Sequence, residues 1–303
     1  MDVSFIELWV VLSFAAAGFQ TLRFMLQKVL STRILSPTGA TFARFVYSAP
    51  IVAMATLMYA RWTGQSVWVP NGAFWLFAAM GGVAQVLATI CVVTIFKSRN
   101  FAVGVTLMKT EVILSVFVGL VLLGEGVGLF AFAAISMGVV GVLLLSKTPQ
   151  AVGWSQFWDP SVGLGLASGL LFAISAVSYR GASLEVTSSD AAFRAAVTLA
   201  AVTMMQMIGM ALWLRVRDPG QIVAVWQARR VAVWIGLMSL AGSFCWFYAF
   251  TLQSAAFVKA VGQVELILSL IASTLIFGER ISRRELAGVA VLGGSILLLV
   301  LVL

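Results

Sequence analysis

Long apolar runs separated by short polar connections make up almost the whole chain. A helix needs about 20 mostly apolar residues to cross a bilayer. Ten segments meet that requirement: 5–27, 39–60, 73–96, 101–123, 127–146, 161–181, 191–214, 231–252, 256–277 and 284–303. The connections between them are too short to hold a separate folded domain. The pattern therefore predicts an all-α, polytopic membrane protein with ten transmembrane helices.

Proline positions agree with these segments, with one exception. Five of the six prolines fall at segment boundaries, where the missing N–H removes no helical hydrogen bond. Pro50 instead lies in the middle of the second segment, in "YSAPIVA". We expect it to kink this helix, and the carbonyl group that it frees should then find a partner inside the bundle.

Composition supports lipid as the main solvent of this chain and argues against an enzyme. Hydrophobic residues make up 61% of it and charged residues only 10%, against roughly 25% charged in soluble domains. Histidine is absent, and the two cysteines, Cys91 and Cys245, lie inside apolar segments. We therefore expect no disulfide framework, no metal site, no cofactor, and too few groups for acid–base catalysis.

The net charge of +8 reports membrane topology rather than nucleic-acid binding, because the basic residues lie mainly in the connections. The odd-numbered connections hold Lys28, Arg33, Lys97, Arg99, Lys147, Arg215, Arg217, Arg229, Arg230, Arg280, Arg283 and Arg284. The even-numbered ones hold Arg61, with Arg180, Arg194 and Lys259 if segment ends are included. Cytoplasmic loops carry the excess of Lys and Arg. We therefore predict that both termini are periplasmic and that the acidic first segment, which carries Glu7, is retained.

Two stretches of the chain repeat each other at an offset of 154 residues. "TLMKTEVILSVFVG" (106–119) corresponds to "AVGQVELILSLIAS" (260–273), so Glu111 matches Glu265 and Ser115 matches Ser269. More loosely, "FARF" at 42–45 corresponds to "AFRA" at 192–195. The sequence thus predicts two five-helix repeats, 1–147 and 148–303. Because five is odd, the second repeat enters the membrane inverted, as in many secondary transporters.

The repeated stretch carries charges inside apolar segments. A charge at a helix centre costs about 2.5–3.5 kcal/mol on insertion scales, so Lys109, Glu111 and Glu265 should face the bundle or a wet cavity. Lys109 and Glu111 are two residues apart and point to nearly opposite sides, which excludes a local ion pair. The two carboxylates either tie helices together, with Ser115 and Ser269, or handle substrate or protons; the structural role is favoured.

Lys109 corresponds to Gln263 in the second repeat, and Lys259 lies one turn before Gln263. One lysine in each half, with an amide beside it, would suit a ligand that bears a carboxylate. The alternative is that a carboxylate of the bundle neutralises Lys109 while Lys259 extends to the membrane surface. Both interpretations remain open at this point.

"FCWFYAF" (244–250) places Trp246 and Tyr248 inside the eighth segment rather than at its end. Buried indole N–H and phenol O–H groups need partners, and aromatic walls with a few polar groups are typical of small-molecule sites. Gln85 and Thr89, one turn apart in the third segment, could supply that polarity. Plain core packing is the competing explanation.

"GLGLASG" (163–169) has the glycine spacing of a dinucleotide-binding turn. It lies within an apolar helix with no strand before it, so close helix packing is the better explanation. The same explanation fits the glycines of the fifth and tenth segments: Gly138, Gly141, Gly288, Gly293 and Gly294.

Two five-helix halves, whose fourth helices end in "LLGE" and "IFGE", resemble the EamA-type transporters of the drug/metabolite transporter superfamily. The Gly-Glu pairs at 124–125 and 278–279 carry the resemblance, which spans essentially the whole chain. "NFAVGVTLMKTEVILSVF" is most similar to bacterial aromatic amino acid exporters of the YddG type. Smaller relatives couple to protons through a carboxylate in the first helix, where this chain has only Glu7, at the start.

The sequence therefore predicts a secondary transporter in a bacterial inner membrane, acting as a monomer on a small molecule. The resemblance implies export, and an aromatic or apolar amino acid is the favoured substrate, moved by alternating access through a cavity between the repeats. A drug or other small-metabolite exporter is the alternative within transport. A passive channel is the alternative from another class.

Overall fold

The computed structural model describes residues 7–33, 35–65, 71–95, 107–145, 160–277 and 282–302. Within these ranges the chain is helical, with turns and short connections and no strand. Seven helices there are long and apolar enough to cross a membrane. The all-α, multi-pass membrane prediction is therefore confirmed.

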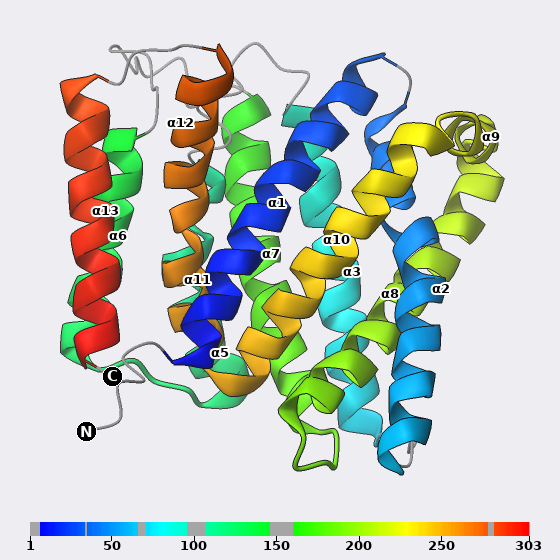
Figure 1. Cartoon of the computed structure of the whole chain (residues 1–303), viewed down its shortest axis with the longest axis horizontal. Coiled ribbons are helices and arrows are strands. Elements are labelled where there is room, and N and C mark those ends of the chain that lie inside the picture. Colours follow the sequence, from blue (N-terminus) through cyan, green and yellow to red (C-terminus); the bar gives the residue numbers. More distant parts are fainter. Residues whose placement is uncertain are drawn as a thin grey trace.

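The helices follow one another up and down through the bundle (Figure 1). Those of the first half are α1 (Leu8–Arg33), α2 (Pro37–Thr63), α3 (Gly72–Ile95), α5 (Glu111–Leu123) and α6 (Leu129–Leu145). Those of the second half are α7 (Pro160–Leu184), α8 (Ala191–Arg217), α9 (Gly220–Gln227), α10 (Arg229–Leu252), α11 (Ala255–Gly262), α12 (Val264–Phe277) and α13 (Arg283–Val302). The first residue of α1 and the last of α13 lie at the same side of the bundle (Figure 1).

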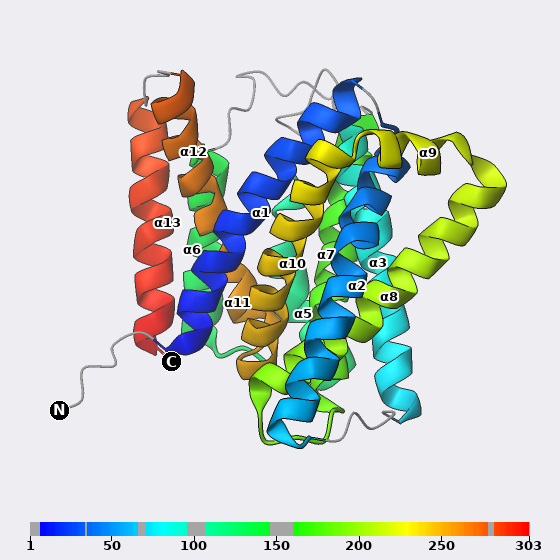
Figure 2. The same ribbon diagram turned by 45° about the vertical axis from the view of Figure 1, so that its right-hand side comes forward.

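Helices of the two halves pack against each other reciprocally. The first long helix of each half contacts the third of the other, α1 with α10 and α7 with α3. The second helices, α2 and α8, also contact each other, and so do α6 and α13. Figures 1 and 2 show α1 and α10 side by side across the centre and the α6–α13 pair at one edge. Two similar halves related by an approximate two-fold axis would make reciprocal contacts of this kind.

Glycine permits the tight contact between α6 and α13. A Cβ atom on Gly141 would lie 2.7 Å from the backbone nitrogen of Leu292, so any side chain there would force the two helices apart. Gly138 and Gly288 are similarly close to the partner helix, whereas Gly293 has no atom within 4 Å of its would-be Cβ position. "GLGLASG" lies inside α7, in agreement with packing rather than dinucleotide binding.

Pro50 lies within α2, which continues unbroken from Pro37 to Thr63. The residue is exposed on the outer surface of the bundle rather than directed at the centre. The proline ring therefore faces outward, while the expected kink and the partner of the freed carbonyl stay predictions. Lipid-facing proline leaves the inward face of α2 free to pack.

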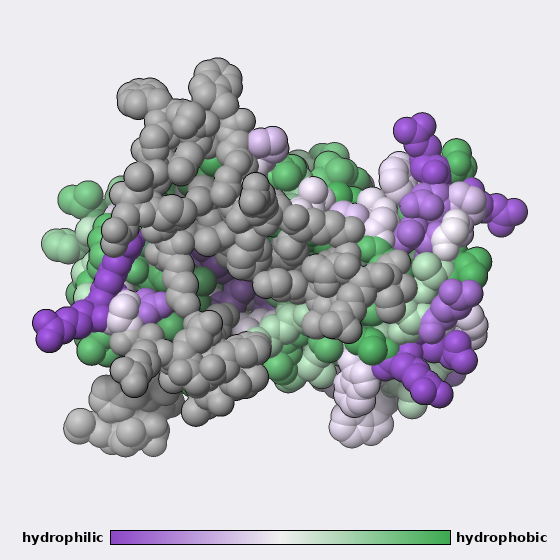
Figure 3. All heavy atoms as spheres, turned by 90° about the horizontal axis from the view of Figure 1, so that it is seen from above, coloured by the Kyte–Doolittle hydropathy of each residue, from purple (hydrophilic) through white to green (hydrophobic). Residues whose placement is uncertain are grey.

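Exposed arginines gather at the end of the bundle where α8 ends and α10 and α13 begin (Figure 1). They are Arg215, Arg217, Arg229, Arg230, Arg283 and Arg284. Seen onto this end, hydrophilic side chains form two groups at opposite edges of the face (Figure 3). By the basic-loop rule, this is the end that we expect in the cytoplasm.

Candidate functional site

Two helices are interrupted at equivalent positions inside the bundle. Leu107 and Met108 are helical, a turn follows at Lys109 and Thr110, and α5 begins at Glu111. In the second half a single turn residue, Gln263, separates α11 from α12. Lys109 and Gln263 are the residues that correspond at the repeat offset of 154. The segments 101–123 and 256–277, expected to be continuous helices, are therefore broken, and neither break contains proline.

Each break places a carboxylate in the first turn of the helix that follows it. Glu111 begins α5, and Glu265 is the second residue of α12. The first turn of a helix has unpaired N–H groups and a partial positive charge, which stabilise an anionic side chain. Lys259 lies in the last turn of α11, where the dipole favours a cation. The breaks thus create favourable local positions for three buried charges.

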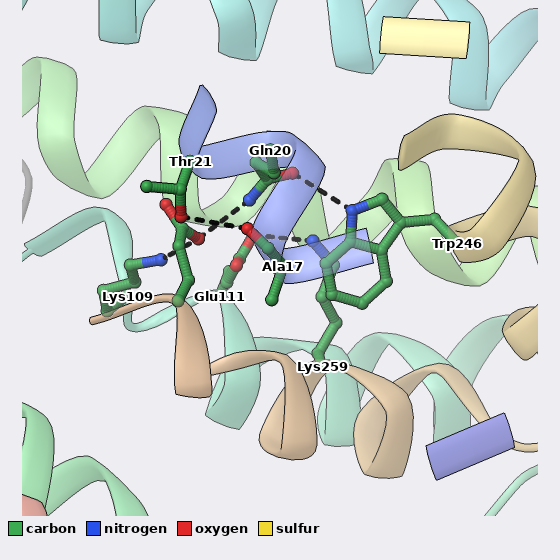
Figure 4. Close-up of polar contacts among 8 residues, drawn as sticks. Ala17, Gln20, Thr21, Lys109, Glu111, Trp246 and Lys259 are labelled. Carbon is green, nitrogen blue, oxygen red and sulfur yellow. Dashed lines mark hydrogen bonds and ion pairs between the residues drawn. The ribbon is translucent and has the colours of Figure 1, made fainter. Parts of the chain in front are cut away.

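These charges pair across the two halves of the chain. Lys109 Nζ lies 2.8 Å from Glu265 Oε2, and Lys259 Nζ lies 3.2 Å from Glu111 Oε2. All four side chains are buried. Figure 4 shows Lys109 and Glu111 approaching from the first half and Lys259 from the second. The alternative interpretation of the two lysines is therefore half right. Lys109 is neutralised by a carboxylate of the bundle, as it expected, but Lys259 is buried and does not extend to the membrane surface.

Gln20 of α1 links this network to an aromatic wall. Its amide nitrogen donates to Glu265 Oε2 at 2.9 Å, and its amide oxygen accepts the indole N–H of Trp246 at 3.1 Å (Figure 4). Lys259 Nζ in turn lies 5.0 Å from the centre of the Trp246 ring, within the range of a cation–π contact. Trp246 therefore has a polar partner on its edge and a cation on its face.

Gly262, at the end of α11, lets Trp246 approach the second break. A Cβ atom on Gly262 would lie 2.3 Å from Cη2 of the indole, which is closer than any side chain permits. The indole therefore occupies space that is available only because residue 262 has no side chain. This contact fixes the ring over Lys259.

A narrow polar cavity adjoins the network. Its open volume is about 30 Å³, room for about two water molecules. Residues of α1, α2, α3, α7, α10 and α11 line it: Gln20, Arg23, Arg44, Gln85, Phe172, Ser175, Ala176, Tyr179, Ser243, Trp246, Phe247, Phe250 and Lys259. In this conformation the cavity is closed to any organic solute.

Of the other candidates chosen from the sequence, Gln85 lines the cavity, whereas Thr89 and Tyr248 do not. Gln85 lines the cavity and accepts from Gln206 Nε2 at 3.1 Å, whereas Thr89 is buried and bonds to the Gln85 carbonyl in its own helix. Tyr248 packs against Phe244, outside the cavity; Tyr179 of α7 is the cavity phenol instead.

The remaining polar candidates at the breaks differ in how they are satisfied. Ser115 bonds only to the carbonyl of Val112, one turn back in α5. The side chain of Ser269 lies outside the described residues. The amide nitrogen and oxygen of Gln263 are both buried without a hydrogen-bond partner among the residues described. Gln263 therefore has unused hydrogen-bonding capacity beside the break.

Two arginines of the cavity were not chosen as site residues from the sequence. Arg23 lies in the middle of α1, and Arg44 in α2; their exposed fractions are 3% and 4%. An arginine within an apolar span is itself a signal of function, and it could have identified Arg23. The sequence analysis noted Arg44 only because it matches Arg194 in the second repeat. In the structure, Arg194 lies in α8 and donates to the Ser183 carbonyl.

The first Gly-Glu pair shapes the far end of α5. Gly124 ends the helix in the left-handed conformation, with a φ of 67°. Among the described residues, the other positive φ is that of Gly64, at 69°. Glu125 then accepts from Arg180 Nε at 2.6 Å, and Arg180 also donates to the Phe250 carbonyl. The pair therefore ties the end of α5 to α7 and α10. The second pair, at 278–279, lies outside the described residues.

No cluster of three or more His, Cys, Asp or Glu residues that could hold a metal occurs in the part of the chain that the structure describes. Cys91 and Cys245 are both free thiols, in α3 and α10. The charged groups at this site are thus arranged as ion pairs and arginines.

Comparison with known proteins supports a transporter. Residues 160–301 match the EamA-like transporter family, which supports the resemblance to the drug/metabolite transporter superfamily. No match was found among the curated proteins. One solved structure, described only as the crystal structure of a protein, aligns over 97% of this chain and 96% of its own, with a TM-score of 0.70 and 14% identity. At that identity the likeness concerns the fold alone. Residues 160–301 are therefore similar to an EamA-like transporter domain, and the chain is a multi-pass membrane protein.

Proposed function

We propose that the whole chain is an EamA-type secondary transporter built from two inverted five-helix repeats, 1–147 and 148–303. The family match covers only the second half. For the first half, the support is the reciprocal packing of α1 with α10 and α7 with α3, together with helix breaks at corresponding positions. Broken helices at the interface of inverted repeats are a recurring feature of secondary transporters.

The observation that carries this proposal is the pair of ion pairs that join the halves. Lys109–Glu265 and Lys259–Glu111 each connect one half to the other beside the cavity. Because the cavity in this conformation holds only about two waters, loading a solute requires the halves to separate on one side. This geometry supports the proposal that the halves rock against each other to give alternating access.

The proposed substrate is a small solute with a carboxylate and an aromatic or apolar group, moved outward. Amino acids with such side chains are the class that the sequence favours, by its similarity to exporters of the YddG type. Trp246, Phe172 and Phe250 supply aromatic cavity walls. The cavity cations suit an acidic group better than they suit a cationic drug.

The membrane setting of the proposal is a bacterial inner membrane, with a monomer as the working unit and both termini periplasmic. Exposed arginines gathered at the opposite end of the bundle support this orientation (Figure 3). Helices from both halves of one chain line the cavity, which supports a monomer as the working unit. The predicted partners are the substrate and the lipid bilayer, with no nucleic acid and no cofactor.

Transport into liposomes tests the proposal. Purified protein is reconstituted, and uptake of labelled phenylalanine, leucine and a cationic drug is measured with and without a proton gradient. Saturable uptake that shows counterflow is expected of a carrier. Uptake that rises linearly with concentration and shows no counterflow would indicate a passive channel, and preference for the cationic drug would indicate a drug exporter.

A further inference from the structure

Arg23 and Arg44 line the cavity and have no ion-pair partner among the residues that the structure describes. Arg44 donates from Nε to Ser239 Oγ at 2.6 Å and from Nη2 to Ser243 Oγ at 3.0 Å. Its third nitrogen, Nη1, is buried without a hydrogen-bond partner among the described residues. Both serines are neutral, so they satisfy part of the guanidinium without balancing its charge.

Arg23 is still less satisfied. Its Nε is buried and has no hydrogen-bond partner in the described part of the chain. The ring of Phe24 lies 4.4 Å from its guanidinium carbon, which is a cation–π contact with the neighbouring residue. The side chain is 3% exposed. A buried guanidinium in this condition is costly unless a ligand completes it.

The carboxylates nearby are already engaged. Glu265 and Glu111 each bind a lysine. The buried charged side chains at the network and cavity are therefore four cations, Arg23, Arg44, Lys109 and Lys259, against two carboxylates. The excess is two positive charges in a closed interior. Such an excess favours a ligand with negative charge and offers no free carboxylate to an ammonium group.

We propose that Arg23 and Arg44 form the site for the acidic group of the transported solute, and that this solute is an organic anion rather than a zwitterion. The proposal rests on the transport function proposed above and changes its favoured substrate: among solutes with a carboxylate and an aromatic group, it places those without an ammonium group ahead of amino acids. A guanidinium presents its N–H groups in a fixed planar fork that matches a carboxylate. The Nε of Arg23 and the Nη1 of Arg44 are the donors left for it. Trp246 and Phe172 would then contact the apolar part of the anion.

A matched set of ligands separates charge from shape. The four compounds each carry one phenyl ring and differ in charge. 3-Phenylpropionate has one carboxylate and benzylmalonate has two. Phenylalanine has a carboxylate and an ammonium group, and phenethylamine has an ammonium group alone. Binding to the purified full chain is measured by calorimetry, and transport in liposomes. We expect the two anions to bind more tightly than phenylalanine, with benzylmalonate tightest and phenethylamine weakest. Tighter binding of phenylalanine than of both anions, or no binding of either anion, would overturn the proposal.

Variants then assign the site to its residues. Arg23→Gln and Arg44→Gln should each weaken binding of 3-phenylpropionate about tenfold or more, because hydrogen bonds to a charged group are among the stronger ones. Arg61→Gln, at an exposed position of α2, is the control and should change nothing. Arg23→Met should keep or raise the melting temperature of the empty protein, since it removes an uncompensated charge, while binding falls. A lower melting temperature with unchanged binding would mean that Arg23 is structural, against the proposal.

The two proposals fail in different ways. If the wild type binds the anions and the arginine variants do not, but no solute crosses the liposome membrane, transport is refuted and the anion site stands. If the wild type transports and neither arginine variant alters transport or binding, the anion site is refuted and transport stands.

Discussion

The ammonium nitrogen of Lys109 lies 2.8 Å from a carboxylate oxygen of Glu265, which is 156 residues further along the chain. Lys259 and Glu111 make the corresponding contact in the other direction at 3.2 Å. The two glutamates occupy equivalent positions in the repeats, whereas the two lysines do not. The halves thus share an arrangement of charge without sharing the residues that provide the cations.

Removing one member of the first pair should destabilise the protein strongly. Lys109→Met leaves the Gln20 amide as the hydrogen-bond partner of Glu265 among the described residues, and breaking a buried ion pair typically costs about 3–5 kcal/mol. The double variant Lys109→Met/Glu265→Leu removes both charges and should recover much of that loss. Thermal unfolding of the three variants in detergent measures the effect. A double variant no more stable than Lys109→Met would show that the ion pair is not the source of the loss.

The pairs also change what Glu→Gln should do. If Glu111 served only as a hydrogen-bonding group, glutamine could replace it. Because Glu111 is the ion-pair partner of Lys259, glutamine would leave a buried cation unpaired. We expect Glu111→Gln to lower stability, and Glu111→Gln/Lys259→Gln to restore it and to keep the pH dependence of transport. If Glu111→Gln stayed fully stable but lost transport or its pH dependence, Glu111 would be handling protons or substrate.

Gly262 should be intolerant of even one methyl group. In Gly262→Ala the new Cβ would lie 2.3 Å from the Trp246 ring, so the indole must move away from Gln20. Overpacking of this kind typically costs about 1–3 kcal/mol. Gly293→Ala, which meets nothing within 4 Å, is the matched control. The melting temperature should fall for Gly262→Ala alone, and Trp246→Phe should partly relieve the defect.

Asp190 caps α8 and gives a pH-dependent contribution to stability. Its carboxylate accepts from the N–H groups of Ala192 and Phe193 and from the Tyr59 hydroxyl. The Tyr59 hydrogen bond, ahead of the backbone ones, holds the pKa of Asp190 below its ordinary value of 3.8. The stabilisation is therefore complete above that value and is lost as the pH falls through the lowered pKa. Asp190→Ala should cost about 1 kcal/mol at pH 7, measured by thermal unfolding, and should show a smaller acid-side decline than the wild type.

Membrane orientation can be tested directly. A reporter that is active only in the periplasm, fused after Leu303, should give signal, because the basic residues of the chain favour cytoplasmic odd-numbered connections. The same reporter inserted between Arg217 and Gln221 should remain inactive. The reverse pattern would mean that the charge bias does not set the orientation of this chain.

The sequence was sufficient for the membrane class, for the approximate positions of most long helices and for the presence of buried charge at Lys109, Glu111 and Glu265. These follow from local composition and from the repeat. The pairing of the charges did not follow, because the partners are 148 and 156 residues apart and no local spacing relates them. The break at Lys109 has no proline or glycine, so the usual signals of a helix end were absent there. At Gln263 the preceding residue is Gly262, which is such a signal but was not used.

The cross-half pairing has a consequence for how the protein is made. Glu111 enters the membrane with the first half, and its partner Lys259 is synthesised 148 residues later. At roughly 5–20 residues per second, this separation corresponds to about 7–30 s of translation. During that interval the nascent first half holds Lys109 and Glu111 in lipid or at the insertion machinery without their native partners. The half-made chain is therefore the form in which unpaired charges are exposed to membrane quality control. This exposure ends when α12 is complete, because Glu265 is then available to Lys109.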